Sequence, residues 1–162
     1  MISINTEVSA FVYGTNAVVG TIFTNKELKM MNQILFITSQ EAKKIKNIAL
    51  LNKHCLVIEI DGEKYPTYND YIRYIEKLLD FPRPCDGIWD RYDDWMTDLS
   101  WLNYTEYVFI VEHYNEFLSK DAYGKQCFYE CFEELILPWW ESEVVDHMVD
   151  GKPMKMNVYL VH

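Results

Sequence analysis

The sharpest chemical signal in the sequence is a short run of aspartates. Asp86, Asp90, Asp94 and Asp98 recur every four residues, and Asp93 lies beside them. On a helix this spacing stacks the side chains on one face, where each like-charge pair destabilises the helix by about 0.2–0.5 kcal/mol. Such a face can imitate the phosphate spacing of a nucleic acid and attract a basic protein. The alternative interpretation is an ordinary solvated helix face, because runs of charge usually lie on the surface.

The charge of the whole chain favours a basic partner. The 162 residues carry 25 acids and 15 bases, a net charge of −10. Residues 1–54 hold 6 Lys and 3 Glu, whereas residues 55–162 hold 22 acids and 9 bases. A second acidic stretch, residues 130–150, has no Lys or Arg and contains Glu130, Glu133, Glu134, Glu141, Glu143, Asp146 and Asp150. A net-negative surface argues against direct binding of nucleic acid or of an anionic membrane.

The cysteines allow a metal site to be considered. Cys127 and Cys131 lie four residues apart, and Cys85 and His147 could join them as ligands. Structural zinc sites usually combine two closely spaced Cys pairs, and the sequence has no second pair. We therefore expect buried thiols packed beside phenylalanines, and no metal.

The sequence lacks the patterns of a catalytic site. Its four histidines lie in no recognisable nucleophile motif, and its six glycines are dispersed instead of forming a phosphate-binding loop. Glu133 and Glu134 are adjacent, so on a helix they diverge by about 100° and do not form a catalytic carboxylate pair by themselves. We expect no enzyme activity and no cofactor.

The sequence also predicts where the protein resides. No stretch reaches the roughly 18 consecutive apolar residues of a membrane helix, and the opening MISINTEVSAF lacks the features of a signal peptide. The four cysteines are too few and too scattered for a disulfide framework. We expect reduced thiols, a cytoplasmic location and no membrane contact.

Hydrophobic periodicity predicts the elements that must position the acids. The predicted strands are residues 8–13, 17–24, 33–38, 55–60, 106–111 and 156–161, with the first two forming a hairpin. The predicted helices are 40–52 capped by Ser39, one begun by Thr67 and ended before Pro82, 86–98, 113–118, and 125–137 ended by Pro138. From residue 55 this order is β-α-α-β-α-α-β, which predicts a parallel sheet with right-handed connections. We expect Trp139 and Trp140 either to be buried beneath a loop or to bind a partner protein, and burial is the commoner role of such a pair.

Residues 57–161 resemble the barstar family, the intracellular inhibitors of barnase-like ribonucleases. The segments that carry the resemblance are VIEIDG, LLDFPRPCDGIWDRYDDWMTDL, YVFIV and MNVYLV. Trp89-Asp90 matches the family's (Leu/Trp)-Asp step, and Asp94 matches its later Asp. The chain departs from the family where Asp86 takes the place of a Gly and Ile88 that of an Asn.

The resemblance implies an α/β fold of three layers, with a small parallel sheet flanked by helices over residues 55–162. The resemblance does not cover residues 1–54, whose apolar strands predict a β-rich extension packed on this domain. This extension lengthens the sheet, mediates oligomerisation or provides a second contact surface. The resemblance also implies that Asp90 and Asp94 plug the basic active site of a ribonuclease toxin, aided by a glutamate for which Glu134, then Glu133, is the nearest match. The whole predicted toxin-binding set is Asp86, Asp90, Asp93, Asp94, Asp98 and Glu134.

Two functions follow from this expectation. The first is an immunity protein that blocks a cognate ribonuclease with an acidic helix. The second is a regulatory module or scaffold of the same fold that binds another basic protein without inhibiting an enzyme. The toxin, its affinity, the role of residues 1–54 and the oligomeric state stay open at this point.

Overall fold

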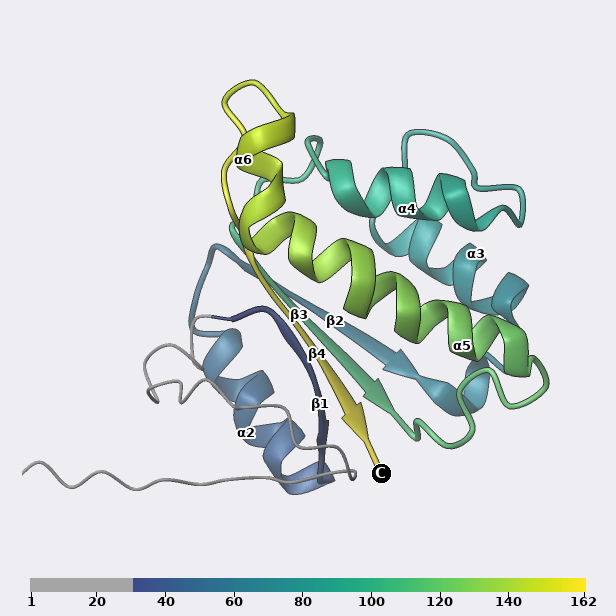
Figure 1. Cartoon of the computed structure of the whole chain (residues 1–162). Coiled ribbons are helices and arrows are strands. Elements are labelled where there is room, and N and C mark those ends of the chain that lie inside the picture. The colour runs from purple at the N-terminus through teal and green to yellow at the C-terminus, as the bar shows by residue number, and fades with distance from the viewer. Residues whose placement is uncertain (1–30) are drawn as a thin grey trace, which may run out of the picture.

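The computed structural model describes residues 31–162 and builds them around one parallel sheet (Figure 1). Its four strands lie in the order β1-β4-β3-β2. Their bounds are Gln33–Ile37 (β1), Cys55–Asp61 (β2), Glu106–Glu112 (β3) and Lys155–Val161 (β4). The predicted parallel sheet is confirmed, and the two strands predicted at 8–13 and 17–24 lie outside the described residues.

Helices cover both faces of this sheet, so the described chain has three layers (Figure 1). On one face lies α2 (Ser39–Ala49). On the other lie α3 (Tyr68–Leu78), α4 (Trp89–Asp98) and a long C-terminal helical stretch. The larger core fills the space under α3, α4 and the long stretch, and a smaller core lies under α2. The expected α/β class, with a small parallel sheet flanked by helices, is confirmed.

The described part of residues 1–54 is built into the same sheet. β1 pairs in parallel with β4, and α2 buries Ala42 and Ala49 against Val108 and Ile110 of β3. Thr38 caps α2 through a reciprocal capping box with Glu41. The predicted cap at Ser39 is therefore wrong by one residue, because Thr38 holds the extended conformation that a helix cap needs.

α3 begins and ends as its sequence predicts. The Thr67 hydroxyl accepts a hydrogen bond from the Asp70 N–H and caps the helix. Its apolar stripe buries Tyr71, Ile72 and Ile75 in the larger core. This helix forms the wall against which α4 packs.

α4 is shorter than predicted. It begins at Trp89 instead of residue 86, because Asp86 (φ 53°) and Gly87 (φ 74°) have left-handed backbone that a right-handed helix does not accept. Leu99 (φ 45°) ends it in the same left-handed region. Asp86 therefore precedes the helix and is not part of its four-residue ladder.

The predicted helix at 113–118 is also wrong. His113 (φ 50°) and Leu118 (φ 52°) both have left-handed backbone, and the segment forms consecutive turns after β3. Its apolar character comes from Phe117 and Leu118, which are buried in the larger core. Burial of two side chains produced a helix-like pattern where the backbone makes turns.

The long C-terminal stretch passes through Pro138 without a break. It runs from α5 (Ala122–Glu130) through π-helical turns at Cys131–Ile136 (η2) and Trp139–Glu143 (η3) to α6 (Val144–His147). The predicted end at Pro138 is wrong because this residue has helical dihedrals (φ −59°, ψ −40°). Wider π turns on either side give the ring room that an α-helical turn lacks.

A 3-10 turn, Gly62–Lys64 (η1), follows β2. Gly62 is required here, because a Cβ atom would lie 2.4 Å from the His113 carbonyl oxygen. Among the described residues, the helices are all too short or too polar to span a membrane.

Candidate functional site

α4 is fixed to the core by its inner face. Tyr92 and Met96 are fully buried. The Tyr92 hydroxyl lies 2.7 Å from the hydroxyl of Tyr71 on α3, and the indole N–H of Trp140 donates to the Met96 carbonyl at 2.8 Å. The outer face of α4 is therefore held rigidly on two neighbouring elements.

Asp90 and Asp94, the aspartate pair, lie on that outer face. Both side chains are exposed. Among residues 31–162 neither forms an ion pair with a Lys or Arg of the chain. The pair is therefore directed outward and is not neutralised by a cation of the described residues, as a surface for a basic partner requires.

Asp86 and Asp98 flank the aspartate pair in different ways. Asp98 is half-buried near the end of α4, where its Oδ1 atom accepts a 3.3 Å hydrogen bond from the Ser100 N–H. Asp86, in the loop before α4, forms an ion pair with Arg91. Arg91 is the only basic residue of α4, so this contact removes it as a partner for the other aspartates.

Asp93 points in a different direction from the aspartate pair. It is half-buried, its Oδ1 atom has no hydrogen-bond partner in the described chain, and the Cys131 thiol donates to its carboxylate. Burial raises the pKa of Asp93, the Cys131 hydrogen bond lowers it, and the charges of Asp90 and Asp94 raise it further. Its buried Oδ1 atom makes Asp93 less accessible to a partner than the exposed aspartate pair.

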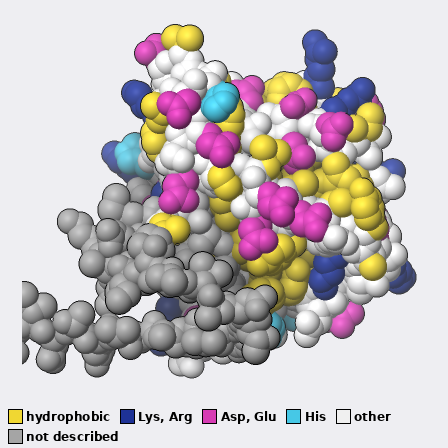
Figure 2. Space-filling model, viewed as in Figure 1, with side chains coloured by type: hydrophobic (Ala, Val, Ile, Leu, Met, Phe, Trp, Pro, Cys, Tyr) yellow, Lys and Arg dark blue, Asp and Glu magenta, His cyan; other side chains and the backbone are white. Residues whose placement is uncertain are grey.

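The Cys131 contact places η2 beside α4. Both glutamates of η2, Glu133 and Glu134, are exposed, and the Tyr129 hydroxyl donates to Glu133 at 3.4 Å. On the side of the molecule that Figure 2 shows, acidic side chains gather near the middle, and Lys and Arg lie mainly towards the margins. The two acidic stretches of the sequence thus lie on neighbouring helical segments.

The cysteines and tryptophans that drew attention in the sequence serve the core. The four cysteines are free thiols; Cys85 is buried and the others are half-buried. Burial raises the pKa of Cys85 to about 12. Trp140 is buried and Trp139 half-buried against His147, so burial is the outcome for the Trp pair.

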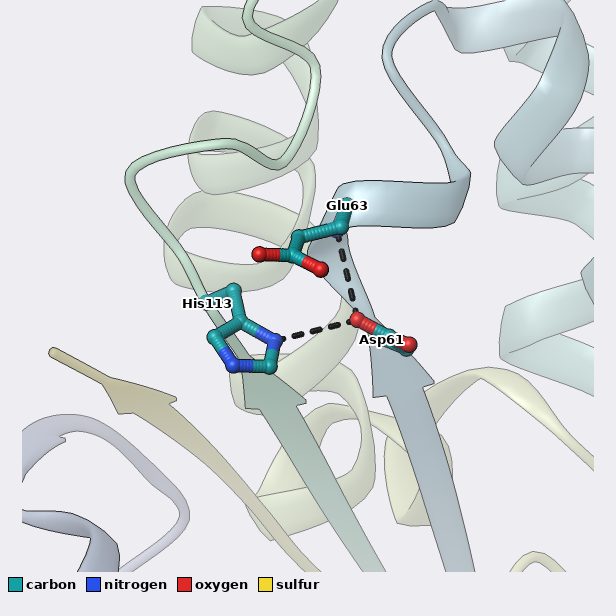
Figure 3. A group of neighbouring side chains, drawn as sticks. All are labelled: Asp61, Glu63 and His113. Atoms are coloured by element: carbon teal, nitrogen blue, oxygen red, sulfur yellow. Dashed lines mark hydrogen bonds and ion pairs between the residues drawn. The ribbon is translucent and has the colours of Figure 1, made fainter.

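A second charged group, missed by sequence reasoning, lies where β2 and β3 end (Figure 3). We call Asp61, Glu63, Lys64 and His113 the Asp61 cluster. The His113 Nδ1 atom and the Lys64 Nζ atom each lie 3.0 Å from a carboxylate oxygen of Asp61. The available signal was positional, because each residue follows or ends one of two strands predicted to be parallel.

Within the Asp61 cluster, Lys64 and His113 balance the charge of Asp61. Hydrogen bonds from Lys64 and His113 lower the pKa of Asp61, and the same contact raises the pKa of His113. Ligand atoms of Asp61, Glu63 and His113 lie within 4.8 Å of one another, which is a spacing that a metal ion could use. Lys64 already occupies one oxygen of Asp61, however, and the side chains of Glu63 and His113 are exposed.

Comparison with known proteins gives one match. A model of the family described as Barstar (barnase inhibitor) matches residues 55–151, more than half of the chain. A search of curated proteins and a search of solved structures each found no significant match. The matched region contains β2, α3, α4, β3 and the whole long helical stretch, whereas β1, α2 and β4 lie outside it.

Proposed function

Because the chain belongs to the barstar family, we propose that it is an immunity protein that blocks the active site of a cognate ribonuclease. The proposal places the protein in the cytoplasm, where it shields the cell that makes the toxin. No chemical step is needed, since occupying the cleft is enough to exclude RNA.

The observation that carries the proposal is the state of the aspartate pair. Asp90 and Asp94 are exposed, unpaired within residues 31–162 and mounted on a helix whose inner face is fixed. A preorganised pair of carboxylates loses little freedom on binding, so more of its attraction for cations contributes to affinity.

The mechanism follows from the same arrangement. The outer face of α4 enters the substrate cleft, and the aspartate pair takes the place of RNA phosphates opposite Lys and Arg side chains. Asp86, Asp98 and Glu134 surround this contact and steer the approach of the enzyme. Asp93, also in the predicted set, supports α4 from its inner flank through Cys131.

The test is co-expression with the toxin gene expected beside the gene for this protein, followed by a ribonuclease assay. The wild-type chain should protect the cell and abolish RNA cleavage, and an Asp90→Ala/Asp94→Ala double variant should not. Glu116→Ala/Asp146→Ala, which removes two exposed acids that lie outside α4, serves as the control of matched charge. Equal protection by wild type and the Asp90/Asp94 variant would mean that the site is assigned wrongly.

The same experiment separates inhibition from binding alone. A complex that forms on co-purification but leaves ribonuclease activity intact would indicate a regulatory module of the same fold. Absence of both a neighbouring toxin and a basic partner would contradict the proposal.

A further inference from the structure

A hollow of about 530 Å³ lies beside the aspartate pair, between the loop that precedes α4 and the outer side of that helix. Asp94 is shared between the pair and the hollow. The other lining residues that matter here are Arg83, Asp86, Arg91, Trp95 and Asp98. The hollow is thus continuous with the surface that the proposed function presents to a ribonuclease.

The charges inside the hollow do not cancel. Arg91 and Asp86 are paired with each other. This leaves the carboxylates of Asp94 and Asp98 against the single guanidinium of Arg83, so the hollow keeps one net negative charge. One further cation would balance it, and a second would leave an excess of positive charge.

Trp95 supplies an aromatic wall. Its ring packs edge-on against Trp101, with centroids 5.6 Å apart, and tilts against Phe81 at 6.4 Å. These contacts hold Trp95 in place on the side where it is half-buried. A fixed indole beside carboxylates favours a guanidinium over an ammonium, because guanidinium is planar, stacks on aromatic faces and pairs with a carboxylate through two hydrogen bonds.

We propose that this hollow receives one arginine side chain from the partner protein, stacked on Trp95 and paired with Asp94 and Asp98. The inference rests on the proposed function, which it deepens: the ribonuclease would present a protruding arginine next to its basic cleft. Recognition would then have two parts, a helix that enters the enzyme and a pocket that the enzyme enters.

The pocket can be tested without any ribonuclease. The full-length protein, with its five Trp indole N–H groups observed by NMR, is titrated with N-acetyl-arginine amide. Binding should shift one indole resonance, assigned to Trp95 by its loss in Trp95→Phe. N-acetyl-citrulline amide has the same shape without the charge and should give no shift.

Substitution of Asp98 sharpens this test. Asp98→Asn should weaken arginine binding about two- to fivefold, as expected for loss of one partly exposed ion pair. Asp146→Asn removes an exposed acid on α6, outside the hollow, and should leave binding unchanged. Asn has nearly the shape of Asp, so both variants are expected to fold. The comparison between them remains valid even if the Trp95→Phe variant does not fold.

Three results would overturn the inference: shifts of similar size at several indoles, the same response to citrulline amide, or equal weakening by Asp98→Asn and Asp146→Asn. The outcome is independent of the ribonuclease assay. Arginine binding without inhibition of any ribonuclease would contradict the proposed function alone, and inhibition without an arginine response would contradict the pocket alone.

Discussion

The Asp61 cluster and the aspartate pair hold similar carboxylates in opposite situations. Asp61 has a lysine and a histidine of the same chain at 3.0 Å, whereas Asp90 and Asp94 have no basic partner among residues 31–162. The cause in α4 is local, since its single arginine pairs with Asp86. Carboxylates paired within the chain contribute to its own stability, and those left unpaired are available to another molecule.

The largest effect expected from this comparison is on inhibition of the ribonuclease. Asp94→Asn should weaken binding by about 30-fold to 5,000-fold, because it leaves enzyme cations buried without a partner at a cost of about 2–5 kcal/mol. The change should appear mainly in the dissociation rate, measured by stopped-flow mixing. Asp61→Asn is the control and should change affinity by less than about twofold. Equal losses of affinity in the two variants would mean that the unpaired Asp94 contributes no more to binding than the paired Asp61.

The next effect concerns the rate of association. An unpaired acidic surface steers a basic protein, so raising the salt concentration from about 0.05 M to about 0.5 M should slow association roughly tenfold or more. Asp98→Asn should lower the rate at low salt and make it less sensitive to salt. An association rate that does not change with salt concentration would mean that the acidic face of α4 does not steer the partner.

Asp93 combines features of both regions, because it is half-buried and has no cation partner within residues 31–162. Because burial raises its pKa, the folded protein is penalised when Asp93 is ionised, and this penalty disappears as the pH falls through that raised pKa. Asp93→Asn should therefore stabilise the protein by about 1 kcal/mol at pH 7 and by less in acid, as measured by urea unfolding. Destabilisation at pH 7 would mean that the Cys131 hydrogen bond to Asp93 outweighs the cost of burying its charge.

The smallest effect belongs to the Asp61 cluster itself. The pKa of His113 is raised mainly by its hydrogen bond to Asp61, so the stabilisation is present at acidic pH and is lost as the pH rises through the raised pKa. Asp61→Asn should lower the NMR titration midpoint of His113. An unchanged midpoint would show that the two side chains do not interact in solution.

Sequence reasoning predicted the strands and α3 well because their signals are local. A β-branched run such as residues 55–60 and a capping residue such as Thr67 depend only on neighbours in the sequence. The exposed positions of Asp90 and Asp94 also followed from helical spacing, once Tyr92 and Met96 were assigned to the core.

The errors arose where tertiary contacts decide the outcome. The start of α4 depends on left-handed backbone at Asp86, and the continuation through Pro138 depends on π turns that no residue pattern announced. Asp93 looked equivalent to its neighbours because the sequence did not reveal that η2 would bring Cys131 against it. The hollow beside Trp95 likewise depends on a loop that returns over α4.

Because β1 pairs with the last strand, β4, the sheet is completed only when distant parts of the chain meet during folding. The Gln33 N–H donates to the side chain of Asn157, 124 positions further along, and the buried Asn32 accepts a hydrogen bond from the Met156 N–H. Pairings so distant in sequence form late and slowly. A fragment limited to residues 55–151 would lose both strands of this pair and leave one side of β3 as an open edge, which is a template for aggregation. Expression boundaries chosen from the family match alone would therefore remove part of what protects the sheet from aggregation.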